Sequence, residues 1–293
     1  MGTELDSRGV DTHDALWSAL ALTTAPEAVR QVHTDYLKAG ARVITTNTYQ
    51  ATLPALLRAG HDAHRAREVI AAGARLAGEA ARRFGAEHPE AQVLIAGGLG
   101  PYGAYLADGS EYTGVYDVGA LDAPVFRDVH LPRIEMLAGE GIDLFALETL
   151  PRLDEAQALV GAVEDLAAES ECWVSFQVRP DGAHLADGTP LAEAAAWAAG
   201  EEAVVAVGVN CVAPDVVARA LPVLHEATTK PLVAYPNSGD LYDPATKTWK
   251  AGEEGDGLAA LAPSWGASGV RLIGGCCRTR PAQIRELAHA LSA

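Results

Sequence analysis

The sequence is poor in positive charge and contains no long hydrophobic run. Its 293 residues include 22 Lys and Arg against 39 Asp and Glu, which gives a formal net charge of −17. Nucleic acids and anionic membranes are bound through clustered Lys and Arg, so this balance argues against both kinds of partner. No stretch of about 18 uncharged apolar residues is present, which argues against a membrane-spanning helix.

A secretory signal is also missing from the first residues of the sequence. Residues 1–6 carry two acidic side chains and form neither a basic nor an apolar segment, so we expect a cytoplasmic protein. The reducing cytosol disfavours disulfides. The four cysteines, Cys172, Cys211, Cys276 and Cys277, are therefore predicted to be free thiols that are either structural or metal-binding.

Short apolar runs alternate with longer segments rich in Ala, Leu, Glu and Arg. Continuous runs of Val, Ile and Leu are typical of strands buried on both faces of a parallel sheet, and the longer segments have helical periodicity. Without a linker or a break in composition, residues 1–293 are predicted to form a single α/β domain. The predicted strands are Arg42–Tyr49, Val93–Leu99, Asp143–Leu150, Cys172–Val178, Val204–Cys211, Leu232–Asn237 and Val270–Gly274. The predicted helices are Ala28–Ala39, His64–Phe84, Arg127–Gly139, Leu153–Ala168, Leu191–Ala199, Asp215–Ala227 and Pro281–Leu291.

Seven strands leave two architectures open. A (β/α)8 barrel needs eight strands to close, whereas a doubly wound open sheet has no such requirement. The pattern therefore predicts either an open sheet or a barrel whose first strand is missing from this sequence.

Three of the cysteines follow predicted strands at their carboxyl ends, where parallel α/β folds place their chemistry. Cys211 ends the fifth strand, and Cys276 and Cys277 follow the seventh. Gly274 and Gly275 precede this pair and allow a sharp turn, because glycine has no Cβ. Three protein ligands with a fourth position open are typical of catalytic zinc, and soft sulfur favours zinc or copper(I). The alternative is three buried cysteines that act as small hydrophobic residues.

Glu148 also stands at the end of an apolar predicted strand. A carboxylate in such a place is costly unless it is paired. We expect it either to bind a substrate ammonium group or to cap the helix that follows.

The segment Gly98–Gly103 matches the dinucleotide-binding pattern G-x-G-x-x-G. That pattern must open a helix, whereas Pro101 and the residues after it have the composition of a loop. We therefore predict a loop from Gly97 to Asp117 that folds over the mouth of the site.

Motifs along the whole chain resemble the zinc-dependent homocysteine S-methyltransferases. The most specific is the combination of Asn-Cys with a distant Gly-Gly-Cys-Cys. The resemblance is greatest to the branch that uses S-methylmethionine or S-adenosylmethionine, and betaine-using enzymes are more distant. The motifs are Thr48–Ala51, Gly100–Tyr105, Asp108–Tyr112, Glu148–Pro151, Asp187–Leu191, Asn210–Cys211, Tyr235–Gly239 and Gly274–Arg278.

The resemblance implies a (β/α)8 TIM-type barrel that binds Zn2+ through Cys211, Cys276 and Cys277. It implies an enzyme that moves a methyl group from a sulfonium donor to the zinc-bound thiolate of homocysteine and so forms methionine. Homocysteine and the sulfonium donor are the expected binding partners.

Under this hypothesis four polar residues contact the substrates. Glu148 would bind the ammonium group of homocysteine, and Thr46 would bind its carboxylate. Gln50 is a candidate for the resting fourth zinc ligand, and Asn237 would orient the donor. The aromatic candidates for binding the cationic donor are Trp17, Tyr49, Tyr102 and Tyr105.

One departure from the family concerns the first strand. Family members begin with a strand that ends in Asp-Gly, and this sequence lacks it, in agreement with the count of seven. A barrel without that strand has two exposed sheet edges and a slot into its core. The alternatives are an inactive or truncated zinc-binding homologue, a betaine-dependent methyltransferase or a Rossmann-type oxidoreductase.

Overall fold

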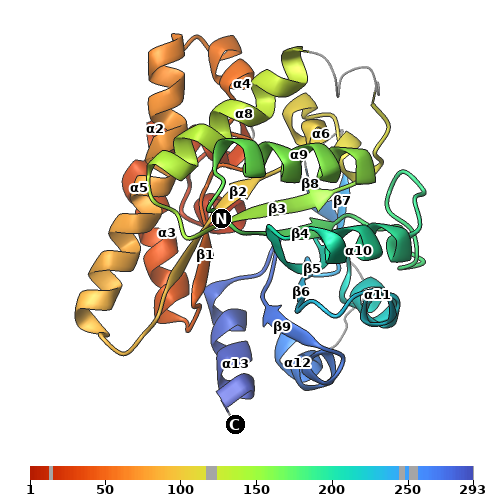
Figure 1. Ribbon diagram of the computed structural model, residues 1–293. Coiled ribbons are helices and arrows are strands. Elements are labelled where there is room, and N and C mark those ends of the chain that lie inside the picture. Colours follow the sequence, from red (N-terminus) through yellow and green to blue (C-terminus); the bar gives the residue numbers. More distant parts are fainter. Residues whose placement is uncertain (13–15, 117–123, 244–247, 251–256, 293) are drawn as a thin grey trace.

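The computed structural model describes residues 1–12, 16–116, 124–243, 248–250 and 257–292, and its centre is a parallel seven-stranded sheet (Figure 1). The strands lie in the order in which they occur in the chain, which is the order of a (β/α)8 barrel and lacks the reversal of a doubly wound sheet. All seven predicted strands are confirmed. They are β1 (Val43–Thr45), β2 (Leu94–Leu99), β3 (Leu144–Leu150), β4 (Cys172–Phe176), β5 (Val204–Asn210), β6 (Leu232–Tyr235) and β9 (Val270–Ile273).

Helices connect successive strands and cover the outer face of the sheet (Figure 1). The seven predicted helices are present, and each differs from its prediction by only a few residues. They are α3 (Pro26–Lys38), α5 (Ala63–Glu87), α8 (Pro124–Gly139), α9 (Leu153–Leu166), α10 (Leu191–Gly200), α11 (Pro214–Ala227) and α13 (Pro281–Ser292). The elements that were not predicted are α1 (Gly2–Ser7), η1 (Trp17–Leu20), α2 (Ala21–Thr24), α4 (Leu53–Arg58), α6 (Tyr102–Leu106), η2 (Ser110–Tyr112), α12 (Leu258–Ala267) and the antiparallel pair β7 (Leu241–Asp243) and β8 (Thr248–Lys250).

Local sequence signals set several helix starts. Asp62 precedes α5 and its side chain accepts a hydrogen bond from the backbone N–H of Arg65 at 2.8 Å. Thr52 caps α4 in the same way, through Ala55 N–H at 3.2 Å. These caps satisfy backbone donors that a helix leaves without intrahelical partners. No helix within the described ranges is long and apolar enough to cross a membrane.

The two faces of the sheet are buried differently. The largest hydrophobic cluster lies between the strands and the outer helices, whereas a smaller cluster fills the inner face with residues such as Ala146 and Trp173. Side chains alternate along a strand, so Glu148 of β3 continues the inner face beyond Ala146. The same alternation places Asn210 of β5 and Tyr235 of β6 at the carboxyl end of the interior.

The sheet is an open barrel. Among the described strands, β1 pairs only with β2 and β9 pairs only with β6. Both unpaired edges line one cavity of about 640 Å³, Val43 and Ile44 on one side and Leu272 and Ile273 on the other. The cavity continues to the carboxyl ends of the strands, where it reaches Cys211. The structure thus confirms the expected barrel, in which the described residues place no strand between β1 and β9.

Candidate metal and substrate site

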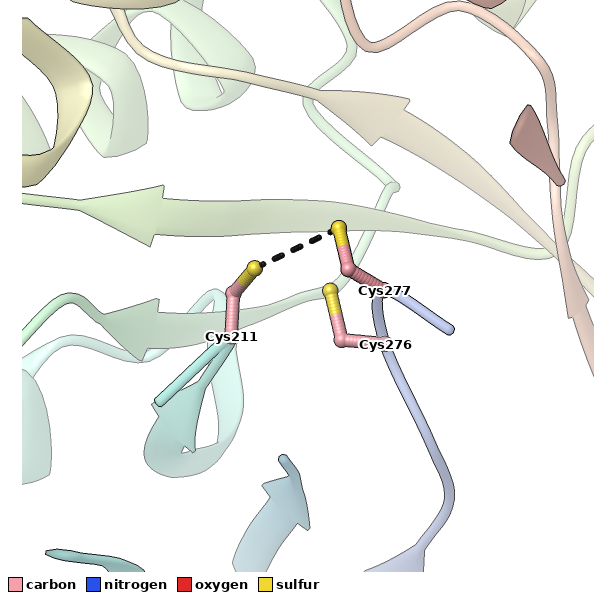
Figure 2. Close-up of side chains that lie close together, drawn as sticks. All are labelled: Cys211, Cys276 and Cys277. Atoms are coloured by element: carbon pink, nitrogen blue, oxygen red, sulfur yellow. Dashed lines mark hydrogen bonds between the residues drawn. The ribbon is translucent and has the colours of Figure 1, made fainter. Parts of the chain in front are cut away.

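Three cysteine sulfurs converge at the carboxyl ends of β5 and β9 (Figure 2). The sulfur of Cys211 lies 3.6 Å from that of Cys277, and all three sulfurs, including that of Cys276, lie within 4.8 Å of one another. A tetrahedral zinc with Zn–S bonds of about 2.3 Å would hold its sulfurs about 3.8 Å apart. The donor set and its spacing therefore fit a thiolate-bound metal.

The local backbone is shaped to bring these sulfurs together. Cys211 has a φ of 54°, in the left-handed region, and hydrogen bonds hold it there: its N–H donates to Tyr235 O at 3.1 Å and its carbonyl accepts from Asn237 Nδ2 at 3.3 Å. Gly275 is required on the other side, because a Cβ there would lie 2.2 Å from Thr279 Cγ2. Of the two glycines, only Gly275 is required on steric grounds, since a Cβ on Gly274 would lie at an ordinary 3.6 Å from Tyr235 Cβ.

Ionisation of the cluster requires a compensating positive charge. Hydrogen bonding with Cys211 and then burial hold the pKa of the Cys276 thiol well above its ordinary value. Neighbouring thiols at this spacing lose their protons together only when a positive ion compensates the charge. Cys172 lies apart in β4, within the hydrophobic core, and burial raises its pKa to about 12.

Asn210 joins the ends of three strands beside the sulfurs. Its Oδ1 accepts from Thr149 N–H at 2.8 Å and from Ser175 Oγ at 2.7 Å, and its Nδ2 donates to Thr149 Oγ1 at 2.8 Å. Thr149 has a φ of 61°, which a β-branched residue adopts only when its surroundings compel it. The Asn210 amide therefore fixes the ends of β3 and β4 relative to the end of β5. This role was not predicted from the sequence.

Glu148 lines the cavity from β3. Gly98 leaves room for it, because a Cβ at that position would lie 3.3 Å from Glu148 Oε1 and only 2.8 Å from Thr45 Cγ2. Burial raises the pKa of Glu148 to about 7, against a hydrogen bond with Tyr235 that lowers it. Trp173 Nε1 donates to the Tyr235 hydroxyl at 3.0 Å and orients it. A carboxylate in this setting attracts a cation that can donate hydrogen bonds.

Thr46 and Gln50 line the same cavity. The Thr46 hydroxyl accepts from Gly98 N–H at 2.9 Å and lies 2.6 Å from Thr48 Oγ1, so a substrate would reach it only by replacing one of these bonds. The Gln50 Nε2 donates to Ala104 O at 2.7 Å, whereas its buried Oε1 has no hydrogen-bond partner among the described residues. That oxygen is available to a ligand or a metal.

Asn237 is placed differently from the other predicted residues. It is not among the residues that line the cavity. Its Nδ2 donates to Cys211 O, and its Oδ1 accepts from Gly239 N–H at 2.9 Å. Its contacts support the backbone of a candidate metal ligand.

Two of the four aromatic candidates reach the cavity. Trp17 and Tyr49 line it and meet edge to face, with ring centroids 6.4 Å apart. Tyr102 and Tyr105 instead pack into the N-terminal hydrophobic cluster. Tyr112, which the sequence analysis missed, lines the cavity with its hydroxyl 4.0 Å from Cys211 Sγ.

A buried ionic network holds the loops that carry these aromatic residues. Arg133 is fully buried and donates to Tyr49 O at 2.8 Å and to Gly100 O at 3.0 Å. Glu155, also fully buried, accepts from Tyr102 N–H at 2.6 Å and carries the opposite charge. The loops after β1 and β2 are thereby fixed to the helices behind them.

Comparison with known proteins shows strong similarity to homocysteine S-methyltransferases. Residues 1–291 match the family of homocysteine S-methyltransferases. The homocysteine S-methyltransferase of Escherichia coli strain K12 is 47% identical over 98% of this chain and 92% of its own length. The homocysteine S-methyltransferase YbgG of Bacillus subtilis strain 168 is 40% identical over 98% of this chain and 91% of its own. The crystal structure of the metallated form of the Escherichia coli homocysteine methyltransferase MmuM has a TM-score of 0.88 at 43% identity, over 99% of this chain and 93% of that one.

Proposed function

This chain belongs to the homocysteine S-methyltransferase family, and from that premise we propose that it transfers a methyl group from a sulfonium donor to homocysteine in a zinc-dependent reaction. The observation that carries the proposal is the convergence of three sulfurs within 4.8 Å beside a cavity that also contains Glu148. The cavity volume of about 640 Å³ lies within the usual range of small-molecule sites.

The metal is proposed to be zinc, held by Cys211, Cys276 and Cys277. Thiolate ligands select zinc over magnesium or calcium, and the Escherichia coli relative has been crystallised in a form described as metallated. Zinc bound there would keep the homocysteine thiol ionised at neutral pH, where a free thiol with a pKa of about 8.5 is only a few per cent thiolate.

The residues of the chain supply binding and orientation. Glu148 is proposed to pair with the homocysteine ammonium, whose charge would lower the carboxyl pKa from about 7 and keep it ionised. The open Oε1 of Gln50 would accept from the substrate or complete the metal site before the substrate arrives. Thr46 is proposed to contact the substrate carboxylate and Asn237 to keep Cys211 in place.

The transfer step itself requires no general acid or base. The carbon–sulfur bond of the donor breaks with its electron pair left on the donor sulfur, and the homocysteine sulfur forms the new bond to the methyl carbon. No proton moves between the two reactants. Alignment therefore supplies most of the acceleration, since effective molarities for well-positioned groups reach about 10⁵ M.

The donor is proposed to be S-methylmethionine first and S-adenosylmethionine second. Both carry a sulfonium charge, and aromatic faces stabilise such cations by about 0.5–2 kcal/mol. Trp17, Tyr49 and Tyr112 line the cavity and are the residues proposed to make this contact.

The metal proposal is tested with Cys276→Ser. We expect the purified wild-type protein to contain stoichiometric zinc by elemental analysis and to form methionine from homocysteine, and we expect the variant to lose both. Cys172→Ala is the matched control, because Cys172 lies in the core and should be dispensable for both properties. A metal-free Cys276→Ser protein with full activity would refute the site.

A further inference from the structure

A second carboxylate, that of Glu111, lies in the same cavity and has no part in the function proposed so far. Glu111 belongs to η2, is 8% exposed and lines the cavity beside Tyr112. A hydrogen bond from its own backbone N–H reaches the carboxylate. Its Oε2 is buried and has no hydrogen-bond partner among the residues that the structure describes.

The position of Glu111 is fixed by close packing. A Cβ on Gly103 would lie 2.5 Å from Glu111 N, so only glycine allows α6 to approach η2 this closely. The turn before η2 is closed by Asp108, whose Oδ1 accepts from Ser110 N–H at 2.9 Å. The backbone that carries Glu111 is therefore held in place by two independent sets of contacts.

Glu111 is also close to the groups proposed to carry the chemistry. Its chain neighbour Tyr112 places a hydroxyl 4.0 Å from Cys211 Sγ. Burial and then the charges of Glu111, Cys211 and Glu148 raise the pKa of Tyr49 well above its ordinary value. One phenol thus lies within electrostatic reach of both acids and of a candidate metal ligand.

The chemistry of the Glu111 carboxylate indicates which kind of ligand group would pair with it. A buried acceptor without a partner is costly, and burial raises the pKa of Glu111 to about 7. The complementary group is a cation that carries N–H donors. Under the proposed function both substrates are α-amino acids, and Glu148 is assigned to only one of the two ammonium groups.

We propose that Glu111 binds the α-ammonium group of the methyl donor, with the rings of Tyr49 and Tyr112 beside it. This assignment rests on the proposed function and narrows it. The donor must then be an α-amino acid with a sulfonium group, because the quaternary nitrogen of betaine has no N–H to donate. Glu111 is accordingly a specificity-determining residue for the donor.

The test compares two donors on the full-length, zinc-loaded protein. S-methylmethionine carries the ammonium group, and 4-(dimethylsulfonio)butanoate is the same sulfonium without it. We expect Glu111→Gln to lower kcat/KM for S-methylmethionine by about 10- to 100-fold, the usual effect of losing a charged hydrogen bond. The same variant should leave kcat/KM for the des-amino analogue and the KM for homocysteine unchanged.

Glu148→Gln is the matched control, since it removes the other acid of the cavity and should raise the KM for homocysteine alone. Equilibrium dialysis of S-methylmethionine against the wild type and against Glu111→Gln adds a readout that does not depend on turnover. Glu111→Gln should weaken this binding by the same factor as it lowers kcat/KM. Equal losses with both donors, or no loss with either, would overturn the assignment.

The outcome also separates this assignment from the proposed function. Methionine formed from betaine but not from S-methylmethionine would overturn the assignment and leave the homocysteine methyltransferase activity intact. If no donor supports turnover, the proposed function fails. The dialysis measurement then still tests Glu111, because S-methylmethionine binding that is as tight in Glu111→Gln as in the wild type would overturn its role.

Discussion

Glu148 is the residue through which pH should act on substrate binding. Burial places its pKa at about 7, so the carboxyl group is protonated below that pH and cannot pair with an ammonium. The KM for homocysteine should therefore fall as the pH rises through about 7. Glu148→Gln should raise the KM about 10- to 100-fold and remove this part of the pH dependence. Initial rates of the wild type and of Glu148→Gln, measured at pH values on both sides of the Glu148 pKa, test this expectation. A KM for homocysteine that is unchanged in the variant would exclude Glu148 from the substrate site.

Residue by residue, the sequence indicated the groups that follow regular strands. Cys211, the Cys276–Cys277 pair and Glu148 were singled out because parallel strands end at a common rim. Glu111 and Tyr112 were missed because η2 lies in an irregular segment, where no periodicity tells which way a side chain points.

Two of the four aromatic predictions, Tyr102 and Tyr105, do not line the cavity for a related reason. Tyr102 and Tyr105 are three residues apart on α6, so one turn of helix places both on the same side. Their rings lie 5.3 Å apart within the N-terminal hydrophobic cluster. A loop, as predicted from the sequence, would not have imposed this common direction.

The strands and the long helices were predicted well because each buries a continuous or periodic apolar surface. The first strand was predicted too long. β1 ends at Thr45, and the hydroxyls of Thr46 and Thr48 then hydrogen bond to the backbone of Gly98 in β2. Beyond Thr45, these side-chain hydroxyls take over the hydrogen bonding to β2 that backbone groups supply within the strand. The sequence of this segment still resembles a strand, so the prediction ran too long. The helix α12 was missed because its apolar residues surround Pro263 without clear periodicity.

The ends of β3, β4 and β5 depend on the side chain of Asn210. Asn210→Ala removes three buried hydrogen bonds and leaves the Thr149 N–H without a partner, so it should cost about 2–4 kcal/mol of unfolding free energy. It should also weaken zinc binding, because the Asn210 amide lies 4.0 Å from Cys276 Sγ and fixes the strand end that Cys211 follows. Urea unfolding and competition with a zinc chelator measure the two effects.

Ser175→Ala provides the control for Asn210→Ala. It removes the bond from Ser175 Oγ to Asn210 Oδ1 and the hydrogen bond of the same hydroxyl with Tyr235, but it leaves both bonds between Asn210 and Thr149, so a loss of about 1–2 kcal/mol is expected, with zinc affinity retained. If Asn210→Ala unfolded at the same urea concentration as the wild type, the amide would not be what fixes these strand ends.

At the scale of the whole molecule, β1 and β9 are the two edge strands of the described sheet, and each has a row of backbone groups without a strand partner. A strand placed between them would satisfy both edges and cover the apolar lining of the slot, which includes Ile44 and Ile273. We expect a strand-forming segment added ahead of Met1 to raise the Tm by at least about 5 °C and to reduce self-association. Thermal unfolding and size-exclusion chromatography test this expectation.

A segment of equal length with a proline in its middle is the control, because proline removes a ladder hydrogen bond. Equal melting temperatures for the two extended proteins and the unextended one would show that the slot does not accept a strand.

The count of seven strands was available from the sequence, whereas the width and lining of the slot depend on the curvature of the sheet and could not be predicted.

The candidate metal ligands come from two strand ends that are joined through β6 and the residues that follow it, because the backbone of Cys211 bonds to Tyr235 and that of Cys276 to Pro236. Cys211 follows β5 in the middle of the sheet, and Cys276 and Cys277 follow β9, which pairs only with β6 among the described strands. A metal bound by all three is a cross-link between the interior and the exposed flank. If the proposed zinc is that metal, its removal would loosen the edge strand β9 from the middle of the sheet before any other strand. Metal content would then set the mechanical integrity of the exposed flank as well as the activity.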